Sequence, residues 1–317
     1  MNARTRWIVG PVVAALVLLA TACGHGGTVD PAKSAVVGAG SPPPSTAAAK
    51  VTQCAGTGQT KHADLVYASS DNPKLTSLDV YQVTRPAGCG PAPILFWVHG
   101  GGWQKGDKAN QLTDKKAWTL AHGWTLVSVD YRLAPKVTYP VPNQDVADAV
   151  AWMLAHARQF GADPTRTALM GHSAGGGIVA AVTTDERYLT EAGSHLSAID
   201  CAVSLDTDGY DISKKGDDGG IYDAMFGTDP SKWADESPLT HVAAGKHIPR
   251  YFIVTRGSAT RRADAHHFAD ALTAAKVPTT IIETSSLDHN GVNGAVGRPG
   301  DTLVTPGLTT FLTSCFA

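Results

Sequence analysis

The stretch Gly171-His172-Ser173-Ala174-Gly175 decides the fold of this chain. The run before it, residues 166–170, is typical of a short buried strand, and residues 178–182 after it are typical of a helix. A serine between two such glycines, where a strand turns sharply into a helix, is held in a strained and exposed geometry. The start of the helix also directs free N–H groups toward any negative charge that develops near the serine. The pattern therefore predicts a reactive serine.

Length and composition limit the class of protein. The 317 residues are 43% hydrophobic and 17% charged, with a formal net charge of -2. That is enough chain for one large α/β domain or two small ones. No basic block follows the N-terminal region, so we expect no nucleic-acid partner.

The N-terminal residues predict export and a lipid anchor. Residues 1–22 combine two arginines with an apolar run too short to span a membrane comfortably, as a signal peptide does. The run ends Leu19-Ala20-Thr21-Ala22-Cys23, which resembles a bacterial lipoprotein signal, except that an alanine stands where leucine is usual. Cys23 would then carry the lipid, and ordinary secretion is the alternative. Residues 23–50, rich in Gly, Ala, Pro and Ser, predict a disordered tether.

Four cysteines remain in the rest of the chain, and an even number in an exported protein indicates disulfides. Cys54 and Cys89 bracket a predicted hairpin, so its outer ends should bring them close. Cys201 opens a predicted strand, and Cys315 lies in the predicted C-terminal helix. Of the three possible pairings we predict Cys54–Cys89 and Cys201–Cys315, and four buried free thiols are the alternative.

Strands and helices alternate along residues 51–317, which predicts one α/β domain. The expected strands are 63–69 and 75–83 (the hairpin), 94–98, 124–129, 166–170, 201–205, 251–255 and 279–283. The expected helices are 115–122, 143–160, 178–182, 263–275 and 307–316. Such alternation indicates a mainly parallel sheet with helices on both faces and the hairpin as an antiparallel edge. Residues 221–245 predict a small cap of loops and short helix.

A second glycine-rich stretch, His99-Gly100-Gly101-Gly102-Trp103, directly follows the apolar strand predicted at 94–98. Together with residues 171–176, it resembles the α/β-hydrolase fold, and the chain is similar to the hormone-sensitive-lipase-like bacterial carboxylesterases. The resemblance implies a serine esterase, with an oxyanion hole made by the N–H groups of Gly101, Gly102 and Ala174. A triple glycine suits that role because it lets the backbone approach a developing oxyanion without obstruction.

The same resemblance implies roles for other residues. Residues 130–135 and Asp145 match the segment that lies between the two motifs in that group. His289 follows the last predicted strand across a short loop and matches the catalytic histidine. His99 is expected to hold its loop by hydrogen bonding. Trp103 is expected to form a wall of the acyl or alcohol pocket, or else to pack in the core.

The acid of the expected triad departs from the family pattern. The family places Asp or Glu three residues after the glycine that ends the next-to-last strand; here that glycine is Gly257 and the position holds Thr260. A threonine cannot carry the charge that stabilises an imidazolium. Asp206 resembles the placement in pancreatic-type lipases and is our first choice. Asp264, also a candidate helix-stabilising carboxylate, and Asp208 remain alternatives.

These residues predict a secreted, membrane-anchored serine hydrolase that cleaves carboxylic esters through an acyl-enzyme. Ser173 would attack, His289 would transfer the proton, and Asp206 would orient His289; no metal or organic cofactor is implied. Two alternatives remain: an amide or formamide hydrolase on the same fold, and a non-catalytic binding protein on a hydrolase scaffold. The compact predicted cap favours small-molecule, short-acyl esters.

Overall fold

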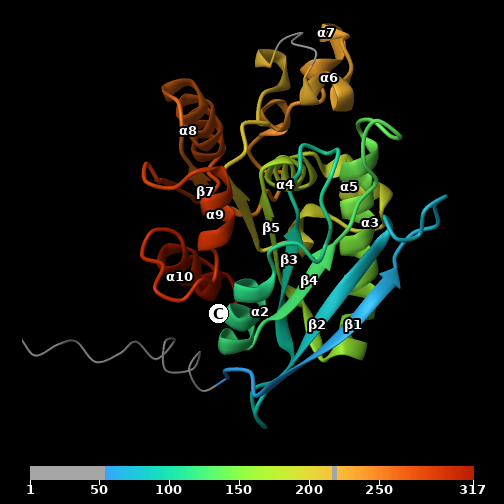
Figure 1. Cartoon of the computed structure of the whole chain (residues 1–317), viewed down its shortest axis with the longest axis vertical. Coiled ribbons are helices and arrows are strands. Elements are labelled where there is room, and N and C mark those ends of the chain that lie inside the picture. Colours follow the sequence, from blue (N-terminus) through green and yellow to red (C-terminus); the bar gives the residue numbers. More distant parts are fainter. Residues whose placement is uncertain (1–53, 216–219) are drawn as a thin grey trace, which may run out of the picture. The chain divides into compact units, whose positions relative to one another are not determined.

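Strand β5, which ends at His172, lies inside an eight-stranded sheet (Figure 1). The computed structural model describes residues 54–215 and 220–317. Within these residues the strand order is β1-β2-β4-β3-β5-β6-β7-β8. The strands are Gly58–Val66 (β1), Ser77–Thr84 (β2), Ala92–Val98 (β3), Thr125–Val129 (β4), Ala162–His172 (β5), Cys201–Leu205 (β6), Arg250–Thr255 (β7) and Thr279–Glu283 (β8).

Helices connect these strands. The α-helices are Thr113–His122 (α2), Val141–His156 (α3), Ala174–Thr184 (α4), Glu186–Glu191 (α5), Ile221–Phe226 (α6), Pro230–Trp233 (α7), Ala259–Ala274 (α8), His289–Ala295 (α9) and Thr305–Cys315 (α10). The 3-10 helices are Ala157–Phe160 (η1), Leu196–Ala198 (η2), Ile212–Lys214 (η3) and Pro238–His241 (η4). Of these, α5 and α9 were not expected from the sequence, and α8 begins four residues earlier than expected, so that Asp264 does not lie in its first turn.

The predicted sheet is confirmed. Strands β3 to β8 pair in parallel, whereas β2 pairs antiparallel with both β1 and β4. The hairpin strands differ in their bounds, because β1 begins at Gly58 rather than at residue 63. Its first residues are polar and carry no apolar alternation; they become a strand because their backbone pairs with residues 82–84 of β2.

Both faces of the sheet are covered by helices, as predicted. Successive side chains of a strand point to opposite faces, and in β3 Ile94 and Phe96 belong to one core cluster whereas Leu95 and Trp97 belong to the other. Helices α3, α4 and α8 contribute to the first cluster, and α2, α9 and α10 contribute to the second. A strand buried on both faces reads as a continuous apolar run, which is why β3 was recognisable from sequence.

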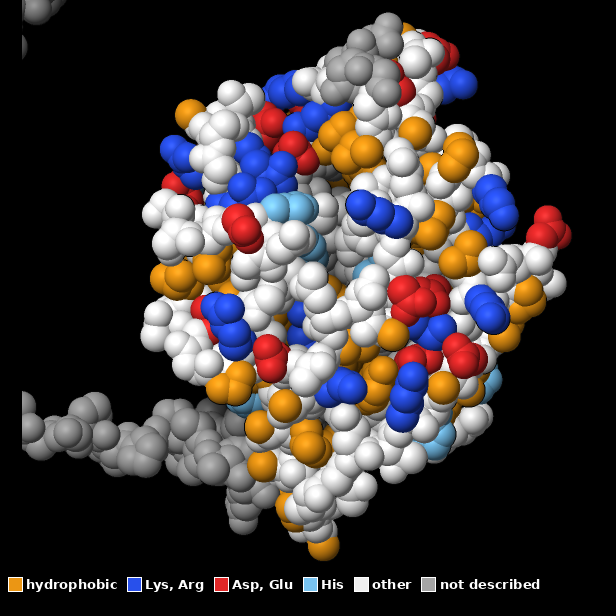
Figure 2. Space-filling view, in the orientation of Figure 1, with side chains coloured by type: hydrophobic (Ala, Val, Ile, Leu, Met, Phe, Trp, Pro, Cys, Tyr) orange, Lys and Arg blue, Asp and Glu red, His pale blue; other side chains and the backbone are white. Residues whose placement is uncertain are grey.

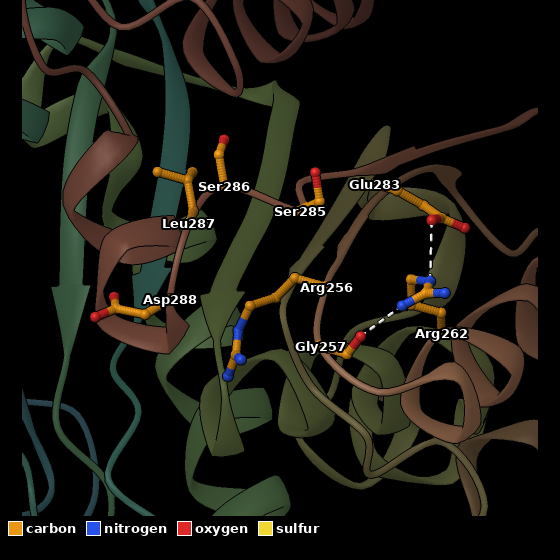
Figure 3. A pocket seen from close by; sticks show the side chains of 8 residues that line it. All are labelled: Arg256, Gly257, Arg262, Glu283, Ser285, Ser286, Leu287 and Asp288. Carbon is orange, nitrogen blue, oxygen red and sulfur yellow. Dashed lines mark hydrogen bonds and ion pairs between the residues drawn. The ribbon is translucent and has the colours of Figure 1, made fainter.

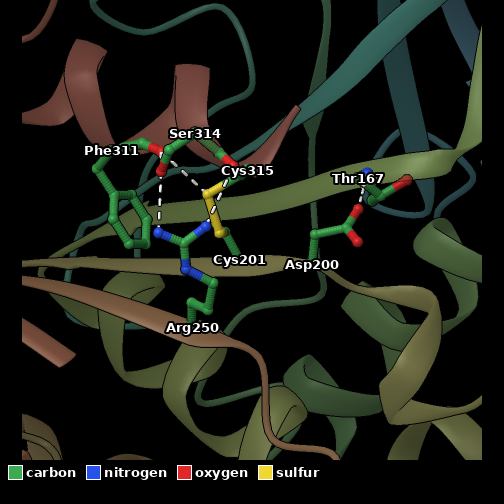
Figure 4. The surroundings of a disulfide bond; sticks show 7 residues. All are labelled: Thr167, Asp200, Cys201, Arg250, Phe311, Ser314 and Cys315. Carbon is green, nitrogen blue, oxygen red and sulfur yellow. Dashed lines mark hydrogen bonds between the residues drawn. A yellow bond between two sulfur atoms is a disulfide. The ribbon is translucent and has the colours of Figure 1, made fainter. Parts of the chain in front are cut away.

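Both predicted disulfides are present. Cys54–Cys89 joins the chain just before β1 to the loop after β2, and Cys201–Cys315 joins the start of β6 to the end of α10. Beside the second bond, Arg250 donates to the Ser314 carbonyl oxygen at 3.1 Å and to Ser314 Oγ at 2.9 Å (Figure 4). The C-terminal helix is thus attached to the sheet by a covalent bond and a charged side chain.

Residues 221–245, predicted as a cap, contain α6, α7 and η4 (Figure 1). Helix α6 packs on the glycine-rich loop after β3: the ring centroid of Trp103 lies 5.5 Å from that of Tyr222 and 5.3 Å from that of Phe226. The backbone N–H of Tyr139 donates to Met225 at 2.8 Å and attaches α6 to the segment before α3. Helix α6 therefore lies beside the carboxyl end of β3.

The predicted signal peptide (1–22), the lipidation site Cys23 and the tether (23–50) lie outside the described residues. Among residues 54–215 and 220–317, no helix combines the length and the apolar character needed to cross a bilayer.

Candidate active site

Ser173 sits at the turn between β5 and α4 with φ 57° and ψ -124°, a conformation that few residues other than glycine adopt. The two flanking glycines make this turn possible. A Cβ on Gly171 would overlap with the carbonyl of Gly175, and a Cβ on Gly175 would overlap with the carbonyl of Val98. The elbow is therefore packed backbone against backbone, and its geometry leaves the serine side chain partly exposed.

The structure brings Ser173, His289 and Asp206 together. His289 Nε2 lies 2.8 Å from Ser173 Oγ, and His289 Nδ1 lies 2.6 Å from Asp206 Oδ2. Both distances are those of hydrogen bonds. Asp206 follows the end of β6 and is fully buried, whereas the His289 side chain is 36% exposed. The arrangement can pass a proton from the serine hydroxyl to an imidazole that a carboxylate orients.

The other two candidate acids do not contact His289. Asp264, on α8, pairs with Lys215 at 3.0 Å. Asp208 pairs with Arg261 at 2.8 Å and accepts a hydrogen bond from the Tyr222 hydroxyl at 2.6 Å. Of the three aspartates, only Asp206 reaches the histidine.

Two arginines that sequence reasoning missed hold the Asp206 carboxylate. Arg256 Nε lies 2.6 Å from Oδ2 and Arg261 Nε lies 2.9 Å from Oδ1, and Arg261 also donates to the Asp206 backbone carbonyl. Burial raises the pKa of Asp206, but the hydrogen bond from His289 and the two guanidinium groups lower it more, so the net shift is downward. Arg256 directly follows β7 at the carboxyl edge of the sheet, which was the available signal for it, whereas Arg261 lies in the first turn of α8.

Arg256 also borders an open cleft of about 560 Å³ between the loop after β7 and the loop before α9 (Figure 3). Across it, Arg262 pairs with Glu283 at 3.1 Å and donates to the Gly257 carbonyl. On the face shown in Figure 2, charged side chains of both signs gather beside a hollow in the surface, in the region of α8. Solvent thus reaches Arg256, whose side chain is 22% exposed, but not Asp206.

The predicted oxyanion residues come from two segments. Gly101 and Gly102 lie in the loop after β3, and Ala174 directly follows Ser173. Gly101 has φ 125°, and a Cβ there would overlap with the Lys105 carbonyl, so glycine is required. Among the described residues, no group accepts a hydrogen bond from the N–H of Gly101 or Gly102. Ala174 is the first residue of α4, and its N–H has no intrahelical acceptor. These three N–H groups are therefore available to an anion.

The glycine-rich loop is fixed by buried polar contacts, as expected for His99. The His99 ring lies 2.8 Å from the Gly100 carbonyl oxygen and stacks on Tyr131 at 4.4 Å, and the Tyr131 hydroxyl donates to the His99 carbonyl at 2.9 Å. Asp145 does not contact the triad. Its carboxylate accepts hydrogen bonds from the backbone N–H and from the guanidinium group of Arg132, and so fixes the segment that contains Tyr131. The matched segment is thus a support for the loop.

A second histidine, His172, is hydrogen-bonded to the backbone of His289. His172 Nε2 donates to the backbone carbonyl of His289 at 2.9 Å. Burial, with the neighbouring His289, lowers the pKa of His172 to about 3, so its imidazole is neutral at physiological pH. Among the described residues, one group of His, Cys, Asp and Glu side chains lies close enough together to hold a metal ion. It consists of His172, Asp206 and His289, which already take part in the hydrogen bonds of this site.

His289 is the first residue of α9 rather than part of a loop. Asp288 caps this helix by accepting from the Gly291 N–H at 2.6 Å, and its carboxylate contacts no ring nitrogen of His289. Lys115, on α2, is 1% exposed and donates to Asn293 Oδ1 at 2.7 Å and to the Asn293 carbonyl at 3.0 Å. Two glycines in α9 lower its helix propensity, which is why the sequence did not predict it.

A family described by its alpha/beta hydrolase fold matches residues 95–293, and the chain belongs to it. Esterase LipI of Mycobacterium tuberculosis is 30% identical over 224 residues, which are 68% of this chain and 70% of LipI. Carboxylesterase NlhH of the same organism is 30% identical over 244 residues, 71% of this chain and 74% of NlhH.

A solved structure agrees in fold. Esterase B from Lactobacillus rhamnosis superposes with a TM-score of 0.68 at 19% identity, covering 85% of this chain and 90% of the other. The family and the two mycobacterial relatives support carboxylic ester hydrolase activity for this chain.

Proposed function

We propose that this protein is a serine carboxylesterase that works through an acyl-enzyme. The observation that carries the proposal is the pair of hydrogen-bond distances from His289 to Ser173, 2.8 Å, and to Asp206, 2.6 Å. In the first half-reaction, Ser173 Oγ attacks the ester carbonyl while His289 Nε2 takes its proton. The tetrahedral intermediate then expels the alcohol, which receives that proton from His289.

In the second half-reaction, water attacks the acyl-serine, His289 takes its proton, and the carboxylic acid leaves as Ser173 regains its proton. The N–H groups of Gly101, Gly102 and Ala174 stabilise the oxyanion in both halves. Asp206 holds His289 in the tautomer with the proton on Nδ1 and stabilises the imidazolium. The lowered pKa of Asp206 supports this role, because the carboxylate then stays ionised.

Substrates are small esters with short acyl chains. The names of LipI and NlhH, an esterase and a carboxylesterase, support the ester class. The short cap helices α6 and α7, of 6 and 4 residues, support the small size.

The test is reaction of the purified protein with a fluorophosphonate probe and with p-nitrophenyl esters of graded acyl length. Wild type should be labelled on Ser173 and should hydrolyse the short esters, and Ser173→Ala should do neither while remaining folded by circular dichroism. Gly101→Val should also lose hydrolysis, because its Cβ would overlap with the Lys105 carbonyl and displace the loop that carries the oxyanion N–H groups. Turnover of anilides or formamides in place of esters would identify an amide hydrolase, and no labelling would identify a binding protein.

We also propose that the protein is exported and held on the outer face of the cell membrane by a lipid on Cys23. The signal-like residues 1–22 and the tether-like residues 23–50 support this. Cys23→Ala should move the protein from the membrane pellet to the soluble fraction, with Cys23→Ser as a second variant. Unchanged partitioning of both would show that any anchor lies elsewhere.

A further inference from the structure

Glu236 is a buried carboxyl group without a partner. It lies between α7 and η4, is 8% exposed, and no described residue donates a hydrogen bond to its buried Oε2. Burial raises the pKa of Glu236 to about 7. Buried polar groups are almost always hydrogen-bonded, and an unpaired buried carboxylate is costly. The Glu236 carboxyl group is therefore an acceptor to which a bound ligand could donate a hydrogen bond.

The cavity that Glu236 borders is lined by residues from three of the four segments that carry catalytic residues. Trp103 follows the oxyanion glycines, Gly177 lies one helical turn after Ser173, and Gly209 lies three residues after Asp206; all three line the cavity with Glu236 and Phe226. The Gly177 N–H donates to the Ser173 carbonyl at 3.1 Å, which fixes its distance from the nucleophile along α4. The space holds a group about the size of one water molecule.

On its other side, Glu236 borders an open groove of about 510 Å³ that Tyr139, Phe226 and Asp235 also line. The rings of Tyr139 and Phe226 lie 5.6 Å apart, and the Trp103 ring lies 5.3 Å from Phe226. Aromatic faces attract cations, and carboxylates pair with them. Carboxylate, aromatic walls and small volume are what a primary ammonium group requires.

We propose that Glu236 and the rings of Trp103 and Phe226 form a subsite for a small primary ammonium group carried by the ester substrate. The inference rests on the proposed esterase function and deepens it. An ammonium is preferred to a neutral hydroxyl because it brings both the missing hydrogen-bond donor and the compensating charge for the buried carboxylate. A larger or quaternary cation would exceed the space beside Gly177.

The test compares isosteric esters in which an ammonium replaces a methyl group: p-nitrophenyl 3-aminopropanoate with butanoate, and 6-aminohexanoate with heptanoate. The measured quantity is the ratio of kcat/KM for the amino ester to that for its partner. In wild type the ratio should exceed one for at least one length. In Glu236→Gln it should fall about 10- to 100-fold, the usual contribution of a charged hydrogen bond.

Asp229→Asn is the matched control. It removes the same charge from a residue near Glu236 that lines neither the cavity nor the groove; its side chain is 52% exposed and lies 3.8 Å from Lys232 Nζ. The ratio should not change in this variant. An equal fall in both variants would mean general attraction of cations and would overturn the subsite.

A second measurement, the pH dependence of the kcat/KM ratio, uses the wild-type protein alone. It therefore tests the subsite even if the Glu236→Gln variant does not fold. The ratio should rise between about pH 6 and pH 8 as Glu236 ionises while the ammonium stays charged. The charged groups near Glu236 are Lys232, Asp229 and Asp235, and the cavity wall opposite it, from α3, α4 and α6, presents the uncharged Asn143, Ile178 and Phe226.

The outcomes separate the two proposals. If wild type hydrolyses butanoate but the ratio stays at or below one for both lengths and at every pH, the esterase function stands and the subsite is wrong. A 3-hydroxypropanoate ester as good as the amino ester would also overturn the cationic ligand. If neither butanoate nor the fluorophosphonate reacts, the esterase function itself fails.

Discussion

The Asp206 carboxylate interacts with His289, Arg256 and Arg261 at 2.6, 2.6 and 2.9 Å. Three donors on one buried carboxylate leave it little freedom to rotate, because both oxygens are engaged. Arg261 extends the network, since it also pairs with Asp208, and Asp208 accepts from Tyr222 on α6. The side chain that orients the histidine is therefore connected to the short helices over the site.

A first prediction at this scale concerns the identity of the acid. Asp206→Asn should lower kcat by about four orders of magnitude, the usual loss when a triad aspartate no longer fixes the tautomer and stabilises the imidazolium. Asp264→Asn should leave the rate within about twofold, because Asp264 pairs with Lys214 and Lys215 and contacts none of the catalytic residues. Steady-state kinetics with a p-nitrophenyl ester decide between them. A large loss in the second variant alone would move the role to Asp264.

A second prediction concerns Arg256. Its guanidinium helps to lower the pKa of Asp206, so the carboxylate stays ionised as the pH falls below the ordinary value of about 4. Arg256→Met should raise that pKa, so the midpoint of the Asp206 carboxyl titration, followed by 13C NMR, should move to higher pH by about one unit. Arg262→Met is the control, because Arg262 pairs with Glu283 instead. A merely structural role for Arg256 predicts a lower rate with an unmoved midpoint of the Asp206 titration.

At the scale of elements, α9 places the histidine, and its position depends on α2. Lys115, on α2, donates to Asn293 of α9 and lies 4.4 Å from the Trp97 ring centroid. Burial lowers the pKa of Lys115 to about 7. A lysine is kept here at that cost because its Nζ satisfies the polar groups of Asn293.

The corresponding prediction is that Lys115→Met loosens α9. The carbonyl and side-chain oxygens of Asn293 would lose their donor, so hydrogen exchange of residues 289–295 should accelerate and kcat/KM should fall about tenfold. Lys116→Met removes the same charge from the next residue, whose Nζ lies over the Tyr81 ring, and should change neither quantity. Unchanged exchange in the Lys115 variant would refute the link between α2 and the histidine.

At the scale of the whole domain, the two disulfides close loops of different length. The bonded cysteines are 35 residues apart for Cys54–Cys89 and 114 apart for Cys201–Cys315. The longer loop gives the larger loss of entropy in the unfolded chain. Cys201–Cys315 also holds α10 on the face of the sheet that α9 covers.

We therefore expect the double variant Cys201→Ala/Cys315→Ala to lower the free energy of unfolding by about 4 to 5 kcal/mol. The double variant Cys54→Ala/Cys89→Ala should lose about 1 kcal/mol less, by the same loop-length argument. Denaturant unfolding measures both. An equal or reversed order would mean that local contacts, and not loop closure, dominate the effect of these bonds.

The local features of the fold were readable from the sequence. The elbow needs glycines at 171 and 175 because two backbone segments touch there, and that requirement is visible wherever the pattern occurs. The continuous apolar run of β3 follows from burial on both faces of a parallel sheet. The pairing of Cys54 with Cys89 followed from a hairpin, a short-range structure. Such features leave a recognisable local pattern in the sequence, even where the contact itself is made with a distant segment.

The choice of acid was decided by the tertiary structure. Asp206 and His289 are 83 residues apart, and their contact depends on the loops that follow β6 and β8 meeting at one edge of the sheet. The sequence could rank Asp206, Asp264 and Asp208 but could not measure which carboxylate reaches the ring. The arginines on Asp206 and the unpartnered carboxyl of Glu236 were invisible for the same reason: burial and partnership are properties of packing between distant segments, and no local pattern records them.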